Sequence, residues 1–260
     1  MFLGGILLFF DTHAHYDDAQ FDPDRDEVLA AMPEAGVSLI VNPGADMVSS
    51  RAARALSARW PFVYFAAGVH PHDAKTMTDG DLDELLSLAA DPKCVAIGEI
   101  GLDYHYDLSP RDVQRLRFTQ QMDLARRAGK PVIIHEREAC ADVLDVVTRY
   151  RDLRGVYHCF SGSWETARIL LDQGWYLSFT GVITFKNARR ALEVVEKMPA
   201  DRLMIETDSP YLAPVPVRGR RNDSRHLPYI AARAAEIRGI DTEELAALTM
   251  ANGKRFFGIP

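Results

Sequence analysis

Cysteine is scarce in this sequence. Its 260 residues include three cysteines, Cys94, Cys140 and Cys159, at wide spacing. An odd number of widely spaced cysteines excludes the disulfide framework of small secreted domains, and none of the three forms a Cys-x-x-Cys pair that would bind zinc. We therefore expect reduced thiols in a cytoplasmic protein.

Long apolar runs are also missing. No segment reaches the roughly 18 consecutive apolar residues of a membrane span. The apolar run at 6–10 lacks a basic leader and continues into Asp11-Thr12-His13 without a small-residue cleavage site. This run is therefore expected to be a first buried strand rather than a secretion signal. Residues 1–5 are interpreted as an N-terminal extension without assigned function, and no membrane partner is expected.

Positive charge is in deficit, with 30 Lys and Arg against 37 Asp and Glu and a net charge of -7. This balance argues against a broad basic surface that binds nucleic acid non-specifically, because such binding depends on neutralising phosphates. One short loop is an exception, since Arg218, Arg220 and Arg221 crowd together in it. Lys186 and Arg189 lie not far before that loop in the sequence.

Glycine-rich phosphate loops of the GxGxxG or GxxxxGK[ST] type do not occur either. What the sequence contains is a regular alternation of short β-branched or aromatic runs with longer amphipathic stretches. Strands that alternate with helices predict a parallel sheet, and eight such units in this length fit a closed (β/α)₈ TIM barrel, an α/β fold. We expect one domain spanning residues 1–260.

The boundaries of these elements follow from the apolar pattern. Expected strands cover residues 7–10, 39–42, 62–69, 95–99, 132–135, 155–158, 175–179 and 203–208. Expected helices cover residues 24–35, 45–59, 79–90, 110–128, 138–150, 164–172, 187–197, 226–238 and 242–256.

Ionisable residues end most of the expected strands, and barrel active sites are built at the carboxyl ends of strands. His13 and His15 alternate along the first strand, so both side chains leave the same side of the pleat, as in a chelate. A single His-x-His often arises by chance. Glu99 ends an apolar strand between Gly98 and Gly101. Its carboxylate can bridge two cations, although a salt bridge to an arginine is the plain alternative.

Three further strands end in ligand-type residues, His135, His158 and Asp208. Imidazole binds zinc and other first-row divalent ions, and Asp208 offers a carboxylate ligand or a general base. Four histidines and two carboxylates exceed the three protein ligands of a typical catalytic zinc, which predicts two divalent ions, Mg²⁺, Mn²⁺ or Zn²⁺. Two such ions activate a water and stabilise the leaving oxygen, so we expect a hydrolase.

Two more histidines, His70 and His72, repeat the alternation after the third strand. They are extra ligands or, in our preferred interpretation, orient a ligand or contact the substrate. His105 and His226 are interpreted as loop or surface residues, and Cys159 as a small buried residue rather than a thiolate ligand.

Taken together and in order, six motifs resemble the TatD family of metal-dependent deoxyribonucleases within the amidohydrolase-like superfamily. They are FDTHAH at 10–15, GVHPH at 68–72, GEIGLDY at 98–104, HEREA at 135–139, HCFSG at 158–162 and ETDSPYL at 206–212. The resemblance implies a barrel that hydrolyses phosphodiester bonds in DNA. It also implies that His13, His15, Glu99 and Asp208 bind one metal, that Glu99, His135 and His158 bind the other, and that Glu99 bridges them.

The residues also suggest roles in catalysis and in substrate binding. Asp208 is expected to accept or relay the proton of the attacking water, and Glu206 either does the same or forms a salt bridge with an arginine. Phosphates are expected to be held by Arg137 and by the basic loop, unless that loop is simply solvated. The expected substrate contacts are His70, His72, Arg137, Arg218, Arg220 and Arg221. Relatives often carry Asn-Glu-Pro where this chain has Asn222-Asp223-Ser224, so contacts made there are expected to differ.

Three interpretations of the function remain open from the sequence. An acidic protein with one basic loop suits DNA ends or short single strands, which points to an exonuclease acting as a monomer. Alternatively, the metals serve hydrolysis of an ester or amide, including an aminoacyl ester on transfer RNA, or the barrel is an inactive binding protein. Four aromatic residues near the predicted mouth either stack on bases or pack the loops, namely Tyr104, Tyr106, Phe160 and Tyr211.

Overall fold

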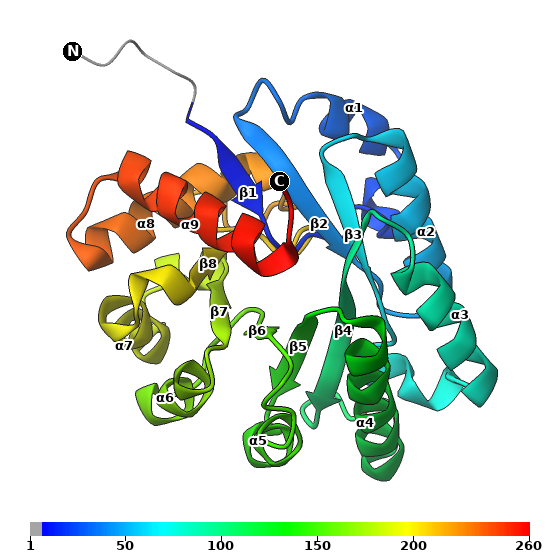
Figure 1. Cartoon of the computed structure of the whole chain (residues 1–260). Helices are drawn as coiled ribbons and strands as arrows, with labels where there is room; N and C mark the ends of the chain where they lie inside the picture. Colours follow the sequence, from blue (N-terminus) through cyan, green and yellow to red (C-terminus); the bar gives the residue numbers. More distant parts are fainter. Residues whose placement is uncertain (1–6) are drawn as a thin grey trace.

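Eight parallel strands form one sheet in the order of the sequence, which confirms the predicted barrel (Figure 1). The structure is a computed structural model and describes residues 7–260. The first and last strands are joined by hydrogen bonds from His15 N to Ser209 O at 2.7 Å and from Asp208 N to His13 O at 2.9 Å. The strands are β1 (Phe9–Asp11), β2 (Val37–Pro43), β3 (Val63–Ala67), β4 (Cys94–Asp103), β5 (Val132–Arg137), β6 (Gly155–Tyr157), β7 (Tyr176–Phe179) and β8 (Leu203–Ile205).

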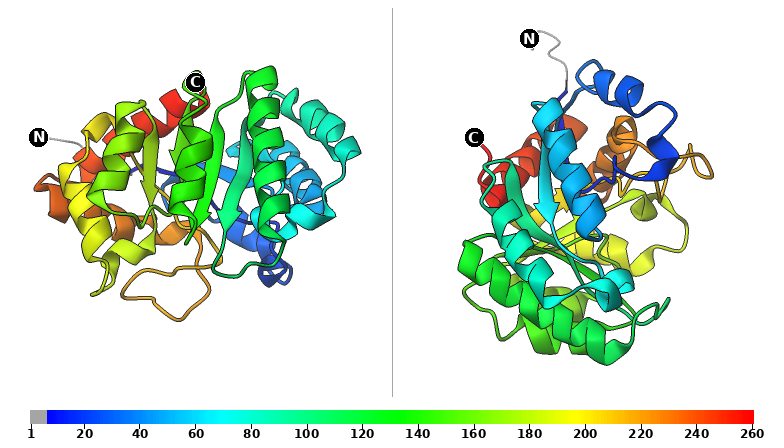
Figure 2. Two further views of the ribbon diagram at one scale, coloured as in Figure 1. Left: turned by 90° about the horizontal axis from the view of Figure 1, so that it is seen from below. Right: turned by 90° about the vertical axis from the view of Figure 1, so that its right-hand side faces the viewer.

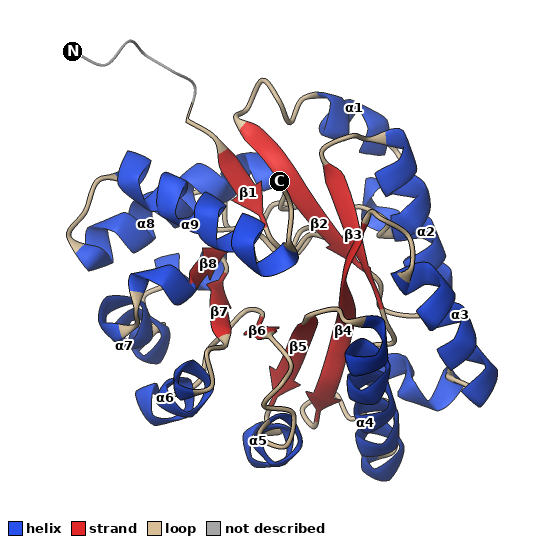
Figure 3. Ribbon diagram, in the orientation of Figure 1, coloured by secondary structure: helices blue, strands red, loops and turns tan. Residues whose placement is uncertain are grey.

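Every expected strand and helix is present, with ends shifted by a few residues; residues 1–5, interpreted as an extension, lie outside the described range. Helices surround the sheet, as the colouring by secondary structure makes plain (Figure 3). They are α1 (Arg25–Ala30), α2 (Met47–Arg59), α3 (Asp79–Ala89), α4 (Arg111–Ala128), α5 (Cys140–Val147), α6 (Trp164–Asp172), α7 (Arg189–Lys197), α8 (Leu227–Arg238) and α9 (Thr242–Phe257).

Local sequence explains where several helices begin and end. Asp46 and Ser49 form a reciprocal capping box at the start of α2, and Ser163 caps α6. Gly129 adopts the left-handed conformation that ends α4. None of the helices within residues 7–260 has the length and apolar character of a membrane span.

The inside of the barrel holds its own apolar cluster, separate from the larger core between strands and helices. Phe10, Val41 and Met204 point into it from the strands, and Phe256 and Phe257 of α9 enter it from one end. In Figure 1 the last turns of α9, in red, accordingly reach across the opening of the ring, and the C-terminus lies beside β1 and β2. Since α9 covers the end where the strands start, the opposite end, where the strands finish, is left for a functional site.

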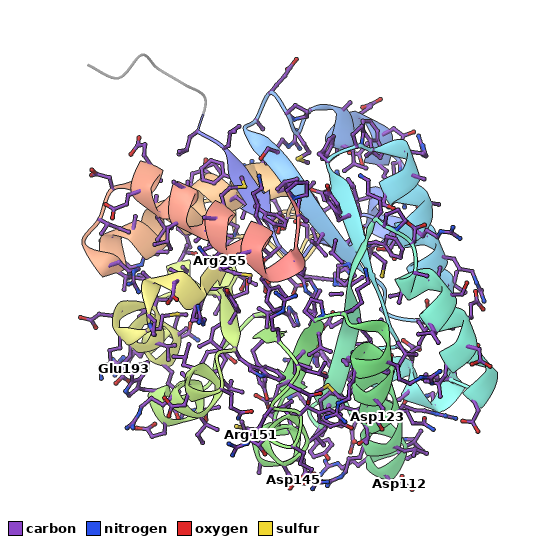
Figure 4. The ribbon with its side chains drawn as sticks, viewed as in Figure 1. Asp112, Asp123, Asp145, Arg151, Glu193 and Arg255 are labelled. Carbon is purple, nitrogen blue, oxygen red and sulfur yellow. The ribbon has the colours of Figure 1, made fainter. Side chains whose placement is uncertain are left out.

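Charged side chains lie on the outer surface of the ring of helices. Figure 4 labels Asp112, Asp123, Asp145 and Glu193 at its periphery. The three cysteines form no disulfide, as expected.

Candidate metal centre

A pocket of about 870 Å³ lies at the carboxyl ends of the strands. Five of the six predicted metal ligands line it: His15, Glu99, His135, His158 and Asp208. The sixth, His13, is completely buried directly behind them. Residues within β4 and β5 and shortly after β1, β6 and β8 thus come together, although they are as much as 195 positions apart in the chain, from 13 to 208.

His13 and His15 face Asp208 across the seam between the first and last strands. The Nε2 atoms of the two histidines are 3.1 Å apart. Oδ1 of Asp208 lies 3.7 Å from Nε2 of His13 and 3.5 Å from Nε2 of His15. Asp208 has a φ of 55°, a left-handed conformation that is uncommon for a residue other than glycine, and it turns here just after β8 ends.

Glu99 presents its two carboxylate oxygens to different groups of histidines. Oε2 lies 3.2 Å from Nε2 of His13 and 3.6 Å from Nε2 of His15. Oε1 lies 2.7 Å from Nδ1 of His135 and 2.8 Å from Nε2 of His158. The side chain is therefore placed between two clusters of ligand atoms, with one oxygen for each.

The separations within each cluster suit a bound cation. Atoms that coordinate one zinc ion at about 2.0–2.2 Å lie roughly 3.3 Å apart in a tetrahedral site. The contacts around Glu99 range from 2.7 Å to 3.6 Å. Groups of ligand atoms that could hold an ion include His13 with His15 and Glu99, and His70 with Glu99 and His135.

Electrostatics of the site favour ionised carboxylates. Burial by itself would raise the pKa of Glu99, but His158, His70 and His13 together hold that pKa well below its usual range. Burial acts on Asp208 in the same way, and the hydrogen bond to His15 with the neighbouring imidazoles lowers its pKa. Both carboxylates are therefore negatively charged at neutral pH, which is the state that binds a cation.

His70, which is not one of the six predicted ligands, lies close to this centre. Its Nε2 atom lies 3.5 Å from Oε1 of Glu99. Burial, together with the positive charge of nearby His135, lowers the pKa of His70 to about 3, so the ring is neutral and can donate a lone pair. His72 lies farther out and lines the pocket.

A second layer of carboxylates orients the histidines. Oδ2 of Asp103 lies 2.8 Å from Nε2 of His72 and 3.2 Å from Nε2 of His135. Oδ1 of Asp103 accepts hydrogen bonds from the backbone amides of His105 and Tyr106. Sequence reasoning did not single out Asp103, although it lies within the GEIGLDY motif and ends the longest strand.

Glu206 is buried behind the pocket rather than in it. Its Oε1 atom accepts a hydrogen bond from Cys159 N at 2.6 Å and lies 3.3 Å from Nδ1 of His158. Across the described part of the chain no arginine pairs with Glu206, so of its two alternative roles the salt bridge is not found.

The three arginines of the basic loop do not line the pocket, and their contact with phosphate stays a prediction. Arg221 makes two hydrogen bonds to the carboxylate of Asp24 and stacks on Phe21, which uses its guanidinium for anchoring the loop. Arg218 and Arg220 are exposed. Arg137 does line the pocket, and its guanidinium lies over the ring of Tyr106 at 4.7 Å.

The four aromatic candidates divide evenly. Tyr106 and Tyr211 line the pocket and are about half exposed. Tyr104 instead donates a hydrogen bond to Asp142, and Phe160 is buried.

A buried hydrogen-bond network joins the ends of β1 and β8 to the basic loop. Asp11 accepts hydrogen bonds from Thr207 N and from the hydroxyl of Ser224. Asn222 donates to the carbonyl oxygens of Thr207 and Tyr211. This network holds the start of the segment before α8 against the ends of the two strands.

Comparison with known proteins agrees with this geometry. The sequence model described as TatD related DNase matches residues 10–258. The chain belongs to the TatD family. Across 254 residues it is 43% identical to YabD of Bacillus subtilis, a protein named as a metal-dependent hydrolase, covering 97% of this chain and all of YabD. It is also 40% identical to a protein of Cronobacter sakazakii named 3'-5' ssDNA/RNA exonuclease TatD, covering 95% and 97% of the two chains.

Solved structures place the fold in the same family. The crystal structure of YjjV, a TatD homologue from Escherichia coli, matches with a TM-score of 0.92 at 29% identity and covers 98% of this chain and all of YjjV. The TatD resemblance and the barrel expected from the sequence are both confirmed, and the protein is a metal-dependent hydrolase.

Proposed function

We propose that this TatD-family protein is an exonuclease that hydrolyses phosphodiester bonds at the ends of single-stranded nucleic acid. The observation that carries the proposal is the position of Glu99, with Oε2 against His13 and His15 and Oε1 against His135 and His158. A bridging carboxylate between two ligand clusters is the arrangement of two-metal phosphodiesterases. A relative that is 40% identical is named a 3'-5' ssDNA/RNA exonuclease.

Each half of the site has its own residues. His13, His15 and Asp208 would hold one divalent ion with Oε2 of Glu99, and His135 and His158 would hold the other with Oε1. Mg²⁺, Mn²⁺ and Zn²⁺ are the candidate ions. Bound there, two such ions lower the pKa of a water between them and neutralise charge on the scissile phosphate.

Asp208 is the proposed proton acceptor, because it lines the pocket and its carboxylate is ionised. Glu206 is buried against His158, so we assign it the positioning of that imidazole rather than proton transfer. Asp103 has the same role toward His135.

The pocket wall suits a nucleotide. Tyr106 and Tyr211 line the pocket and are about half exposed, so each offers ring surface on which a base can stack. Arg137 is the pocket residue best suited to a phosphate, because its guanidinium forms no ion pair in the described chain. A net charge of -7 disfavours a grip on long duplex.

The test compares linear end-labelled DNA, single-stranded and double-stranded, with closed-circular single strands, in Mg²⁺, Mn²⁺ or Zn²⁺. We expect digestion of linear single strands, little cleavage of circles and complete loss of activity in chelator. Circles cut as fast as linear strands would contradict an exonuclease, and activity in chelator would contradict the metal mechanism.

A variant tests the bridge directly. Glu99→Gln should lower turnover by at least 10³-fold, an order of magnitude set by loss of a group that acts on the transition state. The matched control is Glu138→Gln, because Glu138 is exposed and, within residues 7–260, pairs only with His105 at the surface. An ester substrate turned over by the wild type while DNA stays intact would instead support an esterase or amidase.

A further inference from the structure

Five cationic side chains on the rim of the catalytic face have no hydrogen-bond or ion-pair partner within residues 7–260. All five are exposed. Most other arginines are paired with an Asp or Glu or bonded to a backbone carbonyl. The five residues, which we call the basic rim, are Lys186, Arg189, Arg190, Arg218 and Arg220.

The basic rim lies on the segment after β7, which ends in the first turn of α7, and on the loop after β8, and the two segments pack against each other. Val215 N donates a hydrogen bond to the hydroxyl of Thr184 at 2.9 Å. The guanidinium of Arg218 lies over the ring of Phe185 at 4.4 Å. A side chain at Gly181 would collide with the carbonyl of Leu212, so the two backbones touch. Arg218 therefore packs on the residue that directly precedes Lys186, which brings the cations of the two segments close together.

The same two loops also wall the pocket. Val182 lines it from the first loop, and Tyr211 and Leu212 line it from the second. Lys186 follows Val182 by four positions, and Arg218 follows Leu212 by six. Figure 2 (left) shows the second loop, in orange, projecting beyond the end at which the strand arrows finish. The basic rim therefore lies next to the pocket, on the same side of the barrel.

Nearby acids do not cancel this charge. Glu193 is paired with Lys197, Asp223 with Arg225 and Glu236 with Arg233. Burial and the positive charges of Arg225 and Arg220 lower the pKa of His226, against the opposing effect of Asp223. The rim is therefore a local positive surface on a chain whose net charge is -7.

We propose that the basic rim binds the phosphate backbone of a single strand several nucleotides away from the end that occupies the pocket. This inference rests on the proposed function and adds a second binding region, which makes affinity depend on strand length. Lysine and arginine bind phosphates without reading sequence, so the rim contributes affinity and no base preference. Short substrates that fill only the pocket do not reach it.

The test measures binding without catalysis. Fluorescence anisotropy in chelator compares single-stranded DNA of 5 and 20 nucleotides, over 50–400 mM salt, for the wild type and for a triple variant, K186A/R189A/R190A. Each phosphate contact on a single strand contributes about 0.7 to the slope of log affinity against log salt. Loss of three contacts should lower the slope for the 20-mer by about 2 and its affinity in low salt by ten-fold or more.

The control removes two exposed arginines at the other end of the barrel, R127A/R151A. Arg127 lies at the end of α4, and Arg151 follows α5 and is labelled in Figure 4 on the face that carries the C-terminus. The control should keep the wild-type slope. The proposed role of the rim is refuted if the triple variant and the control bind the 20-mer with equal affinity. It is also refuted if the wild type binds the 5-mer and the 20-mer with equal affinity.

Turnover separates the rim from the proposed function. With Mn²⁺ present, the ratio of kcat/KM on the 20-mer to kcat/KM on the 5-mer should fall at least ten-fold in the triple variant. A wild type that degrades both lengths with equal kcat/KM leaves the exonuclease standing and refutes the rim. A wild type that binds the 20-mer through the rim but hydrolyses neither strand refutes the exonuclease alone.

Discussion

Replacing Asp103 with asparagine should switch the tautomer of a metal-binding histidine while leaving the fold intact. In the native protein Oδ2 of Asp103 accepts a hydrogen bond from Nε2 of His135, which leaves the other ring nitrogen, Nδ1, facing Glu99 as the atom that would bind an ion. An asparagine amide in that position would donate to Nε2 instead. The proton of His135 would then move to Nδ1, which could no longer bind a cation.

The size of the effect follows from these contacts. Asp103 is fully buried, and Asp103→Asn keeps an oxygen for the two backbone amides that Oδ1 serves. What is lost is one hydrogen bond to a charged group for each of His135 and His72, and such a bond contributes about 1.5–3 kcal/mol. Loss of the bond to His135 alone therefore corresponds to roughly 10–100-fold weaker metal binding, at about 1.4 kcal/mol per factor of ten.

The assay is a competition titration of Zn²⁺ against a chromophoric chelator, alongside thermal melting. We expect one of two binding steps to weaken in Asp103→Asn and the melting temperature of the chelator-treated protein to change little. Asp107→Asn is the matched control, because Asp107 lies in the same loop and pairs with Arg111 in solvent. Unchanged affinity of both steps in a folded Asp103→Asn variant would refute the tautomer argument.

Three further outcomes follow from packing and burial. Arg221→Ala should lower the free energy of unfolding by about 1 kcal/mol, a small value because the ion pair with Asp24 is partly exposed, and the melting temperature by about 2–4 °C. A hundred-fold loss of kcat/KM with no change in melting temperature would instead indicate that Arg221 binds phosphate. Gly253→Ala should destabilise by about 1–3 kcal/mol in urea unfolding, because the new Cβ would lie 2.6 Å from the ring of Phe10. Gly80→Ala should not, because its Cβ would meet only the hydroxyl of Thr78 at an ordinary contact distance of 3.7 Å. Burial raises the pKa of the Cys159 thiol to about 12, so this thiol should stay unmodified by iodoacetamide at pH 8 until the protein is unfolded. Rapid alkylation of the native protein, measured by mass spectrometry, would contradict this by showing that the thiolate is accessible.

The strands and the positions of the ligand residues were predictable from the sequence because both depend on local pattern. Alternating His13 and His15 follow an apolar run, and His135 ends another, so each could be placed at the end of a strand without knowledge of the fold. Eight strand and helix units also specify a barrel, since parallel strands need helical crossovers that pack on the outside.

Contacts between strands were beyond such reasoning, because they depend on how the barrel closes and on which charges meet there. Arg221 was expected at the substrate, yet Asp24, 197 positions earlier, lies close enough to neutralise it. Asp103 reads as one more acidic residue until β4 and β5 are aligned, when it meets His135. The six proposed ligand residues could therefore be identified from the sequence itself, whereas the tertiary structure alone decided how Glu99 divides its two oxygens between the histidines. An apolar period is a property of neighbours in the chain, but a carboxylate's partners are set by distances that exist only once the chain has folded.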